Sequence, residues 1–447
     1  MKAKHMWWTG TAVVMAAAIA GTAVLGVNIQ RTYNGLDHGT PYSQEAPVTP
    51  LQVAEPGEVD LMALKGRLNE LGKDPALATF GGQVIDTTTG EVVWDRDAAR
   101  PLTPASSTKV LTLAAATLAL DEDERIITQV MQGEKEGTVV LRAAGDVWMT
   151  SEQLDDLASQ VGKADEVILD TSAWAGAPQA PGWDPENVDE GFVAPMEPIM
   201  LYGGRLGKTT GDVPRSHTPA QDLAKALAKR LGTDKVSQGT APQAGVVLGE
   251  VQSAPLSERA QDAAKDSDNV MAEAIGRELA IARGKEPSFA GAAEATLEVL
   301  KVNKIDVTGV TIKDNSGLST ENRISAAVLT QIMNMATETD ELRPLLGYLP
   351  LAGGDGTLYT RYGDSGARGF VRAKTGTLTG VSALAGTVQG NSGRVYAFAF
   401  LVNDGDILAA RKAQDALASA LHDFSVHGHA ILAAGLAKLS GLPTRGR

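Results

Sequence analysis

The 447-residue chain contains no cysteine, and this absence excludes several kinds of functional site. Disulfide bonds, thiolate nucleophiles and cysteine-ligated zinc or iron–sulfur centres all require that residue. Aromatic residues make up only 4% of the sequence, which leaves few side chains for stacking against nucleic-acid bases. Basic residues are also scarce, since 40 of them against 54 acidic ones give a formal net charge of −14. A phosphate-binding surface needs clustered lysine and arginine, so nucleic acid is not expected as a partner.

The N-terminus carries an uncharged run, Met6–Val27, which is preceded by Lys2 and Lys4. At about 1.5 Å of rise per residue, a helix of this length can cross the hydrocarbon core of a bilayer. The positive flank favours a cytoplasmic N-terminus, with the rest of the chain outside the membrane. Residues 1–27 therefore predict export, through either a transmembrane helix that anchors the protein or a cleaved signal peptide. Residues 28–58 contain several prolines and no apolar periodicity, so we expect a linker there.

The remaining sequence predicts strands near its two ends and helices between them. Residues 81–94 alternate around a Thr-Thr-Gly turn, and further alternating segments lie at about 369–402. This order predicts an α+β core whose sheet is completed by the C-terminal strands. Short strand-like runs and Pro/Gly-rich loops between them predict an inserted smaller domain at residues 126–250. The expected core then comprises residues 59–125 and 251–425, and residues 426–447 form a tail.

A Ser-x-x-Lys pattern, Ser106 to Lys109, opens an apolar segment that is expected to form a buried helix. Residues three apart on a helix share a face, so the Lys109 amine can reach the Ser106 hydroxyl. Apolar surroundings lower the pKa of an amine, which would allow Lys109 to act as a base. The helix N-terminus would add backbone N–H groups suited to an oxyanion. A Ser-x-x-Lys pattern can also occur by chance, and in that case the serine would serve only to cap the helix.

Two other short patterns follow along the chain. The tripeptide at 267–269 is Ser-Asp-Asn, just before an apolar helical segment, and ordinary helix capping would explain it as well. The tripeptide at 374–376 is Lys-Thr-Gly, inside a segment that alternates like a strand. A lysine on an edge strand is usually a solvated charge that discourages edge pairing. Lysine and threonine beside a glycine would equally make a clamp for a carboxylate, with room for a substrate backbone.

The order of the three patterns is more informative than each pattern alone. Ser-x-x-Lys, Ser-Asp-Asn and Lys-Thr-Gly, on a helix, a loop and a strand, are the signatures of penicillin-binding proteins and serine β-lactamases. The segments DNSGLSTENRIS (Asp314–Ser325) and LPLAGGDGTL (Leu349–Leu358) further resemble the D-alanyl-D-alanine carboxypeptidase/endopeptidase family. These are the class C low-molecular-mass penicillin-binding proteins, which are serine peptidases. The resemblance extends from about residue 59 to 421.

This resemblance implies a penicillin-binding, transpeptidase-like (serine β-lactamase-like) domain that is interrupted by an insertion between the first two motifs. The implied activity is that of a serine-type D-Ala-D-Ala carboxypeptidase, alone or with DD-endopeptidase activity. Its substrates would be peptidoglycan stem peptides, and β-lactam antibiotics would acylate it. The implied location is the outer face of the cell membrane or the cell wall. Neither a cofactor nor a metal is expected.

The resemblance also implies roles for the residues of the first two motifs. Ser106 would be the nucleophile, and Lys109 would take its proton. Ser267 would relay a proton to the leaving amine. Asn269 would orient Lys109 and bind a substrate amide.

The third motif would bind the end of the substrate. Lys374 would receive the terminal carboxylate together with Thr375 and Thr377, beside the small Gly376. The backbone N–H groups of Ser106 and Thr377 would form the oxyanion hole.

Three other functions fit the sequence less well. A β-lactamase shares the motifs, but the Glu-x-x-x-Asn pattern of its commonest class does not follow Asn269. A non-catalytic wall-binding module is disfavoured by the intact serine and lysine. Gly363–Gly366 has the sequence Gly-Asp-Ser-Gly, as in chymotrypsin-like proteases, but His217 has no matching context, so a loop is expected there.

Overall fold

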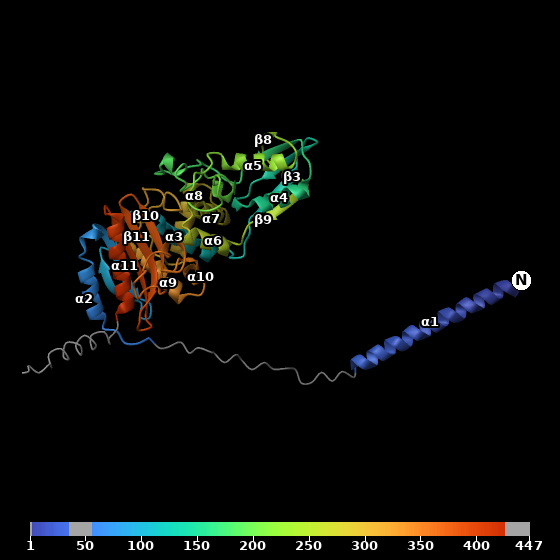
Figure 1. The fold of residues 1–447 in the computed structure, drawn as a ribbon, viewed down its shortest axis with the longest axis horizontal. Helices are drawn as coiled ribbons and strands as arrows, with labels where there is room; N and C mark the ends of the chain where they lie inside the picture. The colour runs from blue at the N-terminus through green and yellow to red at the C-terminus, as the bar shows by residue number, and fades with distance from the viewer. Residues whose placement is uncertain (1, 35–55, 425–447) are drawn as a thin grey trace, which may run out of the picture. The chain divides into compact units, whose positions relative to one another are not determined.

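The computed structural model describes residues 2–34 and 56–424. The chain divides into two units, residues 1–54 and 55–447, and each is described by itself. The described part of the second unit contains two five-stranded sheets, a short two-stranded sheet and the helices that cover them (Figure 1).

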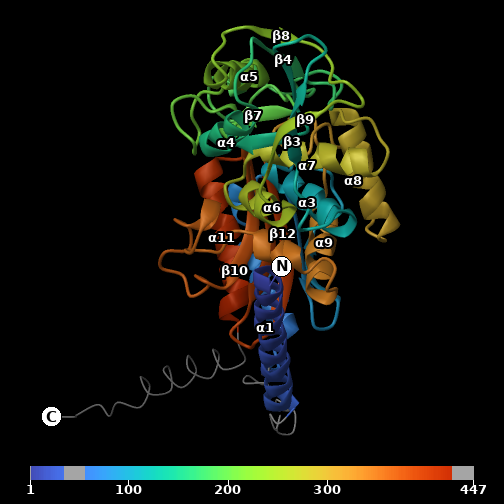
Figure 2. The ribbon, with the colours of Figure 1, turned by 90° about the vertical axis from the view of Figure 1, so that its right-hand side faces the viewer.

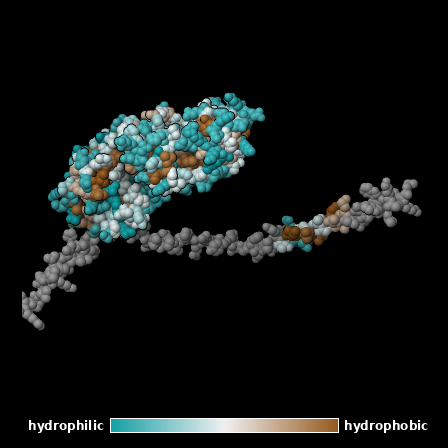
Figure 3. Space-filling model, turned by 45° about the horizontal axis from the view of Figure 1, so that its top comes forward, coloured by the Kyte–Doolittle hydropathy of each residue, from teal (hydrophilic) through white to brown (hydrophobic). Residues whose placement is uncertain are grey.

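The described part of the first unit is a single helix, α1 (Lys2–Asn34). Its described side chains are exposed; Met15 is 64% and Ile19 is 67% accessible, and apolar residues colour this segment in Figure 3. Within the described part of the chain, no helix combines the length and the apolar character needed to cross a membrane, so the predicted transmembrane helix is not supported.

Helix α1 extends into the segment that was predicted as a linker. Residues 28–34 belong to α1, because no proline or glycine interrupts them and nothing in the sequence ends the helix there. Residues 35–55 of that predicted linker lie outside the described residues, and so does the predicted tail at 426–447.

The first sheet joins the two ends of the second unit, in the order β10-β11-β12-β1-β2, and all neighbouring strands are antiparallel. Successive side chains of a strand face opposite sides. In β12, Phe398 and Phe400 accordingly pack into the core formed with α2 and α11, whereas Ala397 and Ala399 face the other helices. The prediction of a sheet completed by C-terminal strands is confirmed. The bounds are β1 (Thr79–Asp86), β2 (Glu91–Arg96), β10 (Val371–Leu378), β11 (Val381–Gln389), β12 (Val395–Asn403), α2 (Leu61–Leu71) and α11 (Ile407–Asp423).

A layer of helices covers the second face of this sheet, with α3 (Thr108–Ala119) among them (Figure 1). Every residue of α3 from Thr108 to Ala116 is buried, as its alanine- and leucine-rich sequence predicts. The other members are α6 (Leu256–Lys265), α7 (Asn269–Ala282), α8 (Phe289–Val302), α9 (Ala326–Glu338) and α10 (Pro344–Tyr348).

A second sheet is formed by the segment between α3 and α6, in the order β8-β6-β4-β3-β9. It has its own buried core, to which α4 and α5 contribute, and Figure 2 shows it beyond the helices α3, α6 and α7. A two-stranded parallel sheet, β5 and β7, accompanies it. The bounds are β3 (Ile127–Gln132), β4 (Thr138–Arg142), β5 (Asp146–Met149), α4 (Ser151–Val161), β6 (Glu166–Asp170), β7 (Ile199–Leu201), α5 (Pro219–Arg230), β8 (Val236–Gln238) and β9 (Val247–Gln252).

Candidate active site

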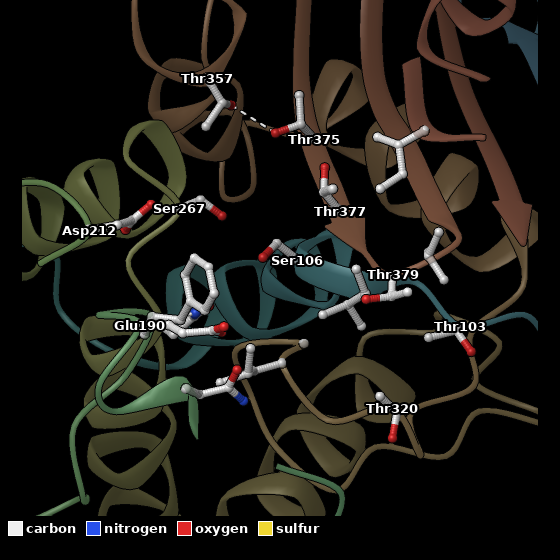
Figure 4. A pocket seen from close by; sticks show the side chains of 18 of the residues that line it. Thr103, Ser106, Glu190, Asp212, Ser267, Thr320, Thr357, Thr375, Thr377 and Thr379 are labelled. Carbon is white, nitrogen blue, oxygen red and sulfur yellow. Dashed lines mark hydrogen bonds between the residues drawn. The ribbon is translucent and has the colours of Figure 1, made fainter. Parts of the chain in front are cut away.

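A cavity of about 1020 Å³ lies where the three sequence motifs meet (Figure 4). Its wall combines the turn before α3, the turn between α6 and α7, strand β10, and a loop of residues 182–192 from the segment of the second sheet. The predicted site residues in its lining are Ser106, Ser267, Asn269, Thr375 and Thr377. Three others, Lys109, Lys374 and Gly376, lie behind this lining.

Ser106 lies in a short 3₁₀ turn, Ala105–Ser107, and not inside α3 itself. The turn depends on close approaches that only glycine permits. A Cβ on Gly376 would lie 2.6 Å from the carbonyl oxygen of Pro104, and one on Gly317 would lie 2.0 Å from that of Ala105. The glycine of the third motif therefore allows β10 to pack against the turn that carries Ser106.

Lys109 is fully buried in the first turn of α3, and its amine contacts three oxygens. Nζ lies 3.2 Å from Ser106 Oγ, 2.6 Å from Asn269 Oδ1 and 2.7 Å from the carbonyl oxygen of Ser316. Burial lowers the pKa of Lys109 to about 8, although the nearby carboxylates, above all that of Asp314, partly offset this effect. A fraction of the amine is therefore neutral near pH 7 and available to accept a proton.

Ser267 lies in the turn between α6 and α7 with a φ of 59°, a left-handed conformation that is strained for serine. Its Oγ accepts a hydrogen bond of 2.9 Å from Lys374 Nζ, which also donates to the carbonyl of Thr375. Lys374 is fully buried, and burial together with the charge of Lys109 holds its pKa well below the ordinary value. The alternative of a solvated lysine on an edge strand is therefore wrong, although β10 is an edge strand.

Asp268 caps α7 and is held by two arginines that the sequence analysis did not single out. Arg205 Nη2 lies 2.9 Å and Arg215 Nη2 lies 3.7 Å from Asp268 Oδ2, and all three side chains are almost fully buried. Burial opposes ionisation of Asp268, but Arg215 and Arg205 outweigh it and hold the pKa of the carboxyl below its usual range. No local sequence signal links these residues, because Arg205 precedes Asp268 by 63 positions.

We expect Arg215→Met to lower the free energy of unfolding by about 3 kcal/mol, because it removes part of the counter-charge of a buried carboxylate. Arg215 also donates to the carbonyls of Gly191 and Gly203, which would lose their partner. The contribution of Asp268 is present at neutral pH and is lost as the pH falls through its depressed pKa, so the deficit should shrink in acid. Urea unfolding at several pH values measures this.

The matched control for that variant is Arg343→Met, because the Arg343 side chain is 56% exposed and its ion-pair partner, Asp340, is exposed as well. Exposed pairs contribute at most about 1 kcal/mol, so little change is expected. Equal unfolding energies for the two variants would contradict a stabilising role for Arg215.

The loop after α8 carries the carbonyl that contacts Lys109, and two buried carboxylates hold it. Glu273 Oε1 accepts hydrogen bonds from the backbone N–H groups of Asn315 (2.9 Å) and Ser316 (2.7 Å). Asp314 accepts from the N–H groups of Gly317 and Ser319 and from Trp183 Nε1. Burial, with the charge of Asp314, raises the pKa of Glu273 to about 7. Both carboxylates lie in segments with the family resemblance, but sequence reasoning assigned them no role.

The Gly-Asp-Ser-Gly segment lies apart from the motifs. Ser365 occupies a turn before β10, where its hydroxyl contacts Ser419 Oγ at 2.8 Å, and it does not line the cavity. His217 is exposed and contacts Asp189. The prediction of a loop at Gly363–Gly366 is therefore confirmed.

Comparisons with known proteins find relatives over most of the chain. A model of the D-Ala-D-Ala carboxypeptidase 3 (S13) family matches residues 64–216 and 206–423. Carboxypeptidase DacB of Mycolicibacterium smegmatis is 41% identical over 93% of this chain and 97% of its own. A carboxypeptidase of Mycobacterium tuberculosis is 42% identical over 78% of this chain and 81% of its own.

Among solved structures, penicillin-binding protein 4 of Haemophilus influenzae superposes with a TM-score of 0.68 at 21% identity. The match covers 80% of this chain and 98% of that one. The predicted penicillin-binding fold, of mixed α and β content, is confirmed.

Proposed function

Since the chain belongs to the D-Ala-D-Ala carboxypeptidase 3 (S13) family, we propose that it hydrolyses the terminal D-Ala–D-Ala bond of peptidoglycan stem peptides with Ser106 as its nucleophile. The observation that carries the assignment of Ser106 is its contact with the buried amine of Lys109, which Asn269 and the Ser316 carbonyl hold in place. By the same chemistry the protein also cleaves peptide cross-bridges, which is a DD-endopeptidase activity.

In the first half of the reaction, the neutral Lys109 amine takes the proton of Ser106 while Oγ attacks the carbonyl carbon of the penultimate residue. The negative charge that develops on the carbonyl oxygen is received by the backbone N–H groups of Ser106 and Thr377. Strand β10 is an edge strand, so alternate N–H groups point away from β11. Those of Val371 and Ala373 donate to the carbonyls of Ala367 and Pro350, and Thr377 belongs to the same alternation further along the strand, beside the cavity.

In the second half, the bond to the leaving D-alanine breaks and its nitrogen takes a proton from Ser267, whose hydroxyl Lys374 contacts. The proton that Lys109 took from Ser106 then restores the Ser267 hydroxyl, so the Lys109 amine is neutral again. Water attacks the acyl-enzyme and gives its proton to Lys109, which returns it to Ser106 Oγ as the shortened peptide leaves. The terminal carboxylate is received by the hydroxyls of Thr375 and Thr377, with the charge of Lys374 behind them. A penicillin acylates Ser106 by the same steps, and the reaction then stops at the acyl-enzyme.

The domain limits remain a proposal as well. We assign the catalytic domain to residues 59–125 and 251–425, and the inserted domain to residues 126–250. In support, the segment between α3 and α6 forms a sheet and a buried core of its own.

The assay that tests this function measures release of D-alanine from a peptide ending in D-Ala-D-Ala, alongside covalent labelling by penicillin. Steady release together with a long-lived adduct is the expected result. Rapid turnover of penicillin without release of D-alanine would instead indicate a β-lactamase. Binding of cell wall without either reaction would indicate a non-catalytic module.

The cell-wall substrate requires the protein to work outside the cytoplasm, and we propose that the apolar run Met6–Val27 directs its export. The positive flank of Lys2 and Lys4 supports this role, and so do the exposed apolar side chains of α1. A retained membrane anchor and a cleaved signal peptide are both compatible with these features. We expect the protein in the extracytoplasmic fraction, where N-terminal sequencing distinguishes the two; cytoplasmic protein with an intact N-terminus would contradict export.

A further inference from the structure

Arg411 of α11 brings a positive charge to the cavity that the motifs do not account for. Its Nη2 donates a hydrogen bond of 2.8 Å to Thr377 Oγ1, and both residues line the cavity together with Ser106. The neighbouring Arg361 is paired with Asp415. Arg411, by contrast, forms no ion pair with any carboxylate in residues 56–424. Asp415 acts on its charge only through space and is already paired with Arg361, so the guanidinium is available to an anion in the cavity.

The lysine of the third motif is less well placed for an anion. Lys374 is fully buried, is absent from the cavity lining, and directs its amine at Ser267 Oγ and the carbonyl of Thr375. Arg411 is only half-buried, so its guanidinium is accessible from the cavity. Burial, with the charge of Arg361 added, lowers the pKa of Arg411, but a guanidinium stays protonated at neutral pH.

The contact with Arg411 also determines which further hydrogen bonds the Thr377 hydroxyl can form. A hydroxyl that accepts a hydrogen bond from arginine keeps its own hydrogen for another acceptor. Thr375 and Thr377 are two residues apart on β10, so their side chains share one face of the strand, and Figure 4 shows both beside Ser106. An anion at this face meets the hydroxyl of Thr377, that of Thr375, which contacts Thr357 Oγ1 at 2.8 Å, and a guanidinium. The guanidinium is the fork-shaped donor that carboxylates pair with best.

We propose that Arg411 binds the C-terminal carboxylate of the substrate, together with Thr375 and Thr377, and so selects peptides with a free C-terminus. This inference rests on the proposed function, because it names the residue that recognises one end of its substrate.

The test compares Arg411→Gln with the wild-type full-length chain on two peptides. One ends in D-Ala-D-Ala with a free carboxylate, and the other is the same peptide ending in a carboxamide. For the acid, we expect kcat/KM to fall by about tenfold to a hundredfold, mainly through KM, as for the loss of one charge-assisted hydrogen bond. The carboxamide peptide should be little affected, and Arg411→Lys should recover part of the loss.

The matched control is Lys412→Gln, which removes the same charge from the next, exposed position of α11 and should leave both peptides unaffected. Equal losses of Arg411→Gln on the two peptides, or no loss on the acid, would overturn the inference. Either result leaves the proposed function standing as long as the wild type releases D-alanine. A wild type that releases none overturns the proposed function itself.

Discussion

Ser106→Ala is expected to abolish penicillin labelling and to reduce D-alanine release by about 10⁴- to 10⁶-fold, the range seen when a serine hydrolase loses its nucleophile. The hydroxyl of Ser106 lines the cavity and contacts the Lys109 amine. Alanine removes only that hydroxyl, so the fold should remain intact. Mass spectrometry of the penicillin-treated protein and an assay of D-alanine release measure the two effects.

The matched control is the neighbouring Ser107→Ala. Ser107 is fully buried, and its hydroxyl has no hydrogen-bond partner among the described residues. Its removal should therefore preserve labelling and cost no stability, since an unpaired buried hydroxyl is itself unfavourable. A penicilloyl adduct on Ser107 or Ser365 would show that the nucleophile has been misassigned.

Lys109→Met is expected to slow acylation by about 10²- to 10⁴-fold, the usual contribution of a general base. Methionine fills a similar volume but offers no amine to Ser106. The exposed Lys412→Met is the control for loss of a lysine charge, and penicillin acylation followed in a stopped-flow instrument gives the rate. Acylation at the wild-type rate would assign the proton transfer to another group.

The pH dependence of the acylation rate provides a second test of the role of Lys109. Only the neutral amine accepts a proton, and the pKa of Lys109 is about 8, so the acylation rate should fall about tenfold for each pH unit below this value. Burial lowers the pKa of Lys374, and the charge of Lys109 lowers it further, so the two lysines titrate as a coupled pair and the observed midpoint belongs to both. The Lys109→Met variant should lose this dependence on pH.

The contact between Ser106 and Lys109 and the place of Thr375 and Thr377 on a strand could be predicted because the information for them is local. Ser106 and Lys109 are three residues apart in a segment with a clear helical composition, and Thr375 and Thr377 lie in an alternating strand. The order of the motifs then identified the family. The sheet could also be predicted, since its strands β1, β2 and β10–β12 alternate or form continuous apolar runs.

The sequence did not predict groups that act through distant contacts. The fold brings separate elements together and so allows Arg205 to contact Asp268 and Arg411 to contact Thr377. In its own sequence segment, each of these arginines looks like an ordinary charged residue on the surface. The burial of Lys374 was missed for a similar reason. An edge strand is usually solvated, but here the turns that carry Ser106 and Ser267 cover it.

The arginines that hold Asp268 connect the second motif to the segment of the second sheet. Arg205 and Arg215 both lie between residues 126 and 250, whereas Asp268 lies beyond that segment, so its buried charge is balanced by side chains from a different part of the chain. The strained turn of Ser267, next to Asp268, therefore depends on counter-charges that the three motifs do not supply. A chain from which residues 126–250 are removed would carry all three motifs and still lack the counter-charges that fix the second one.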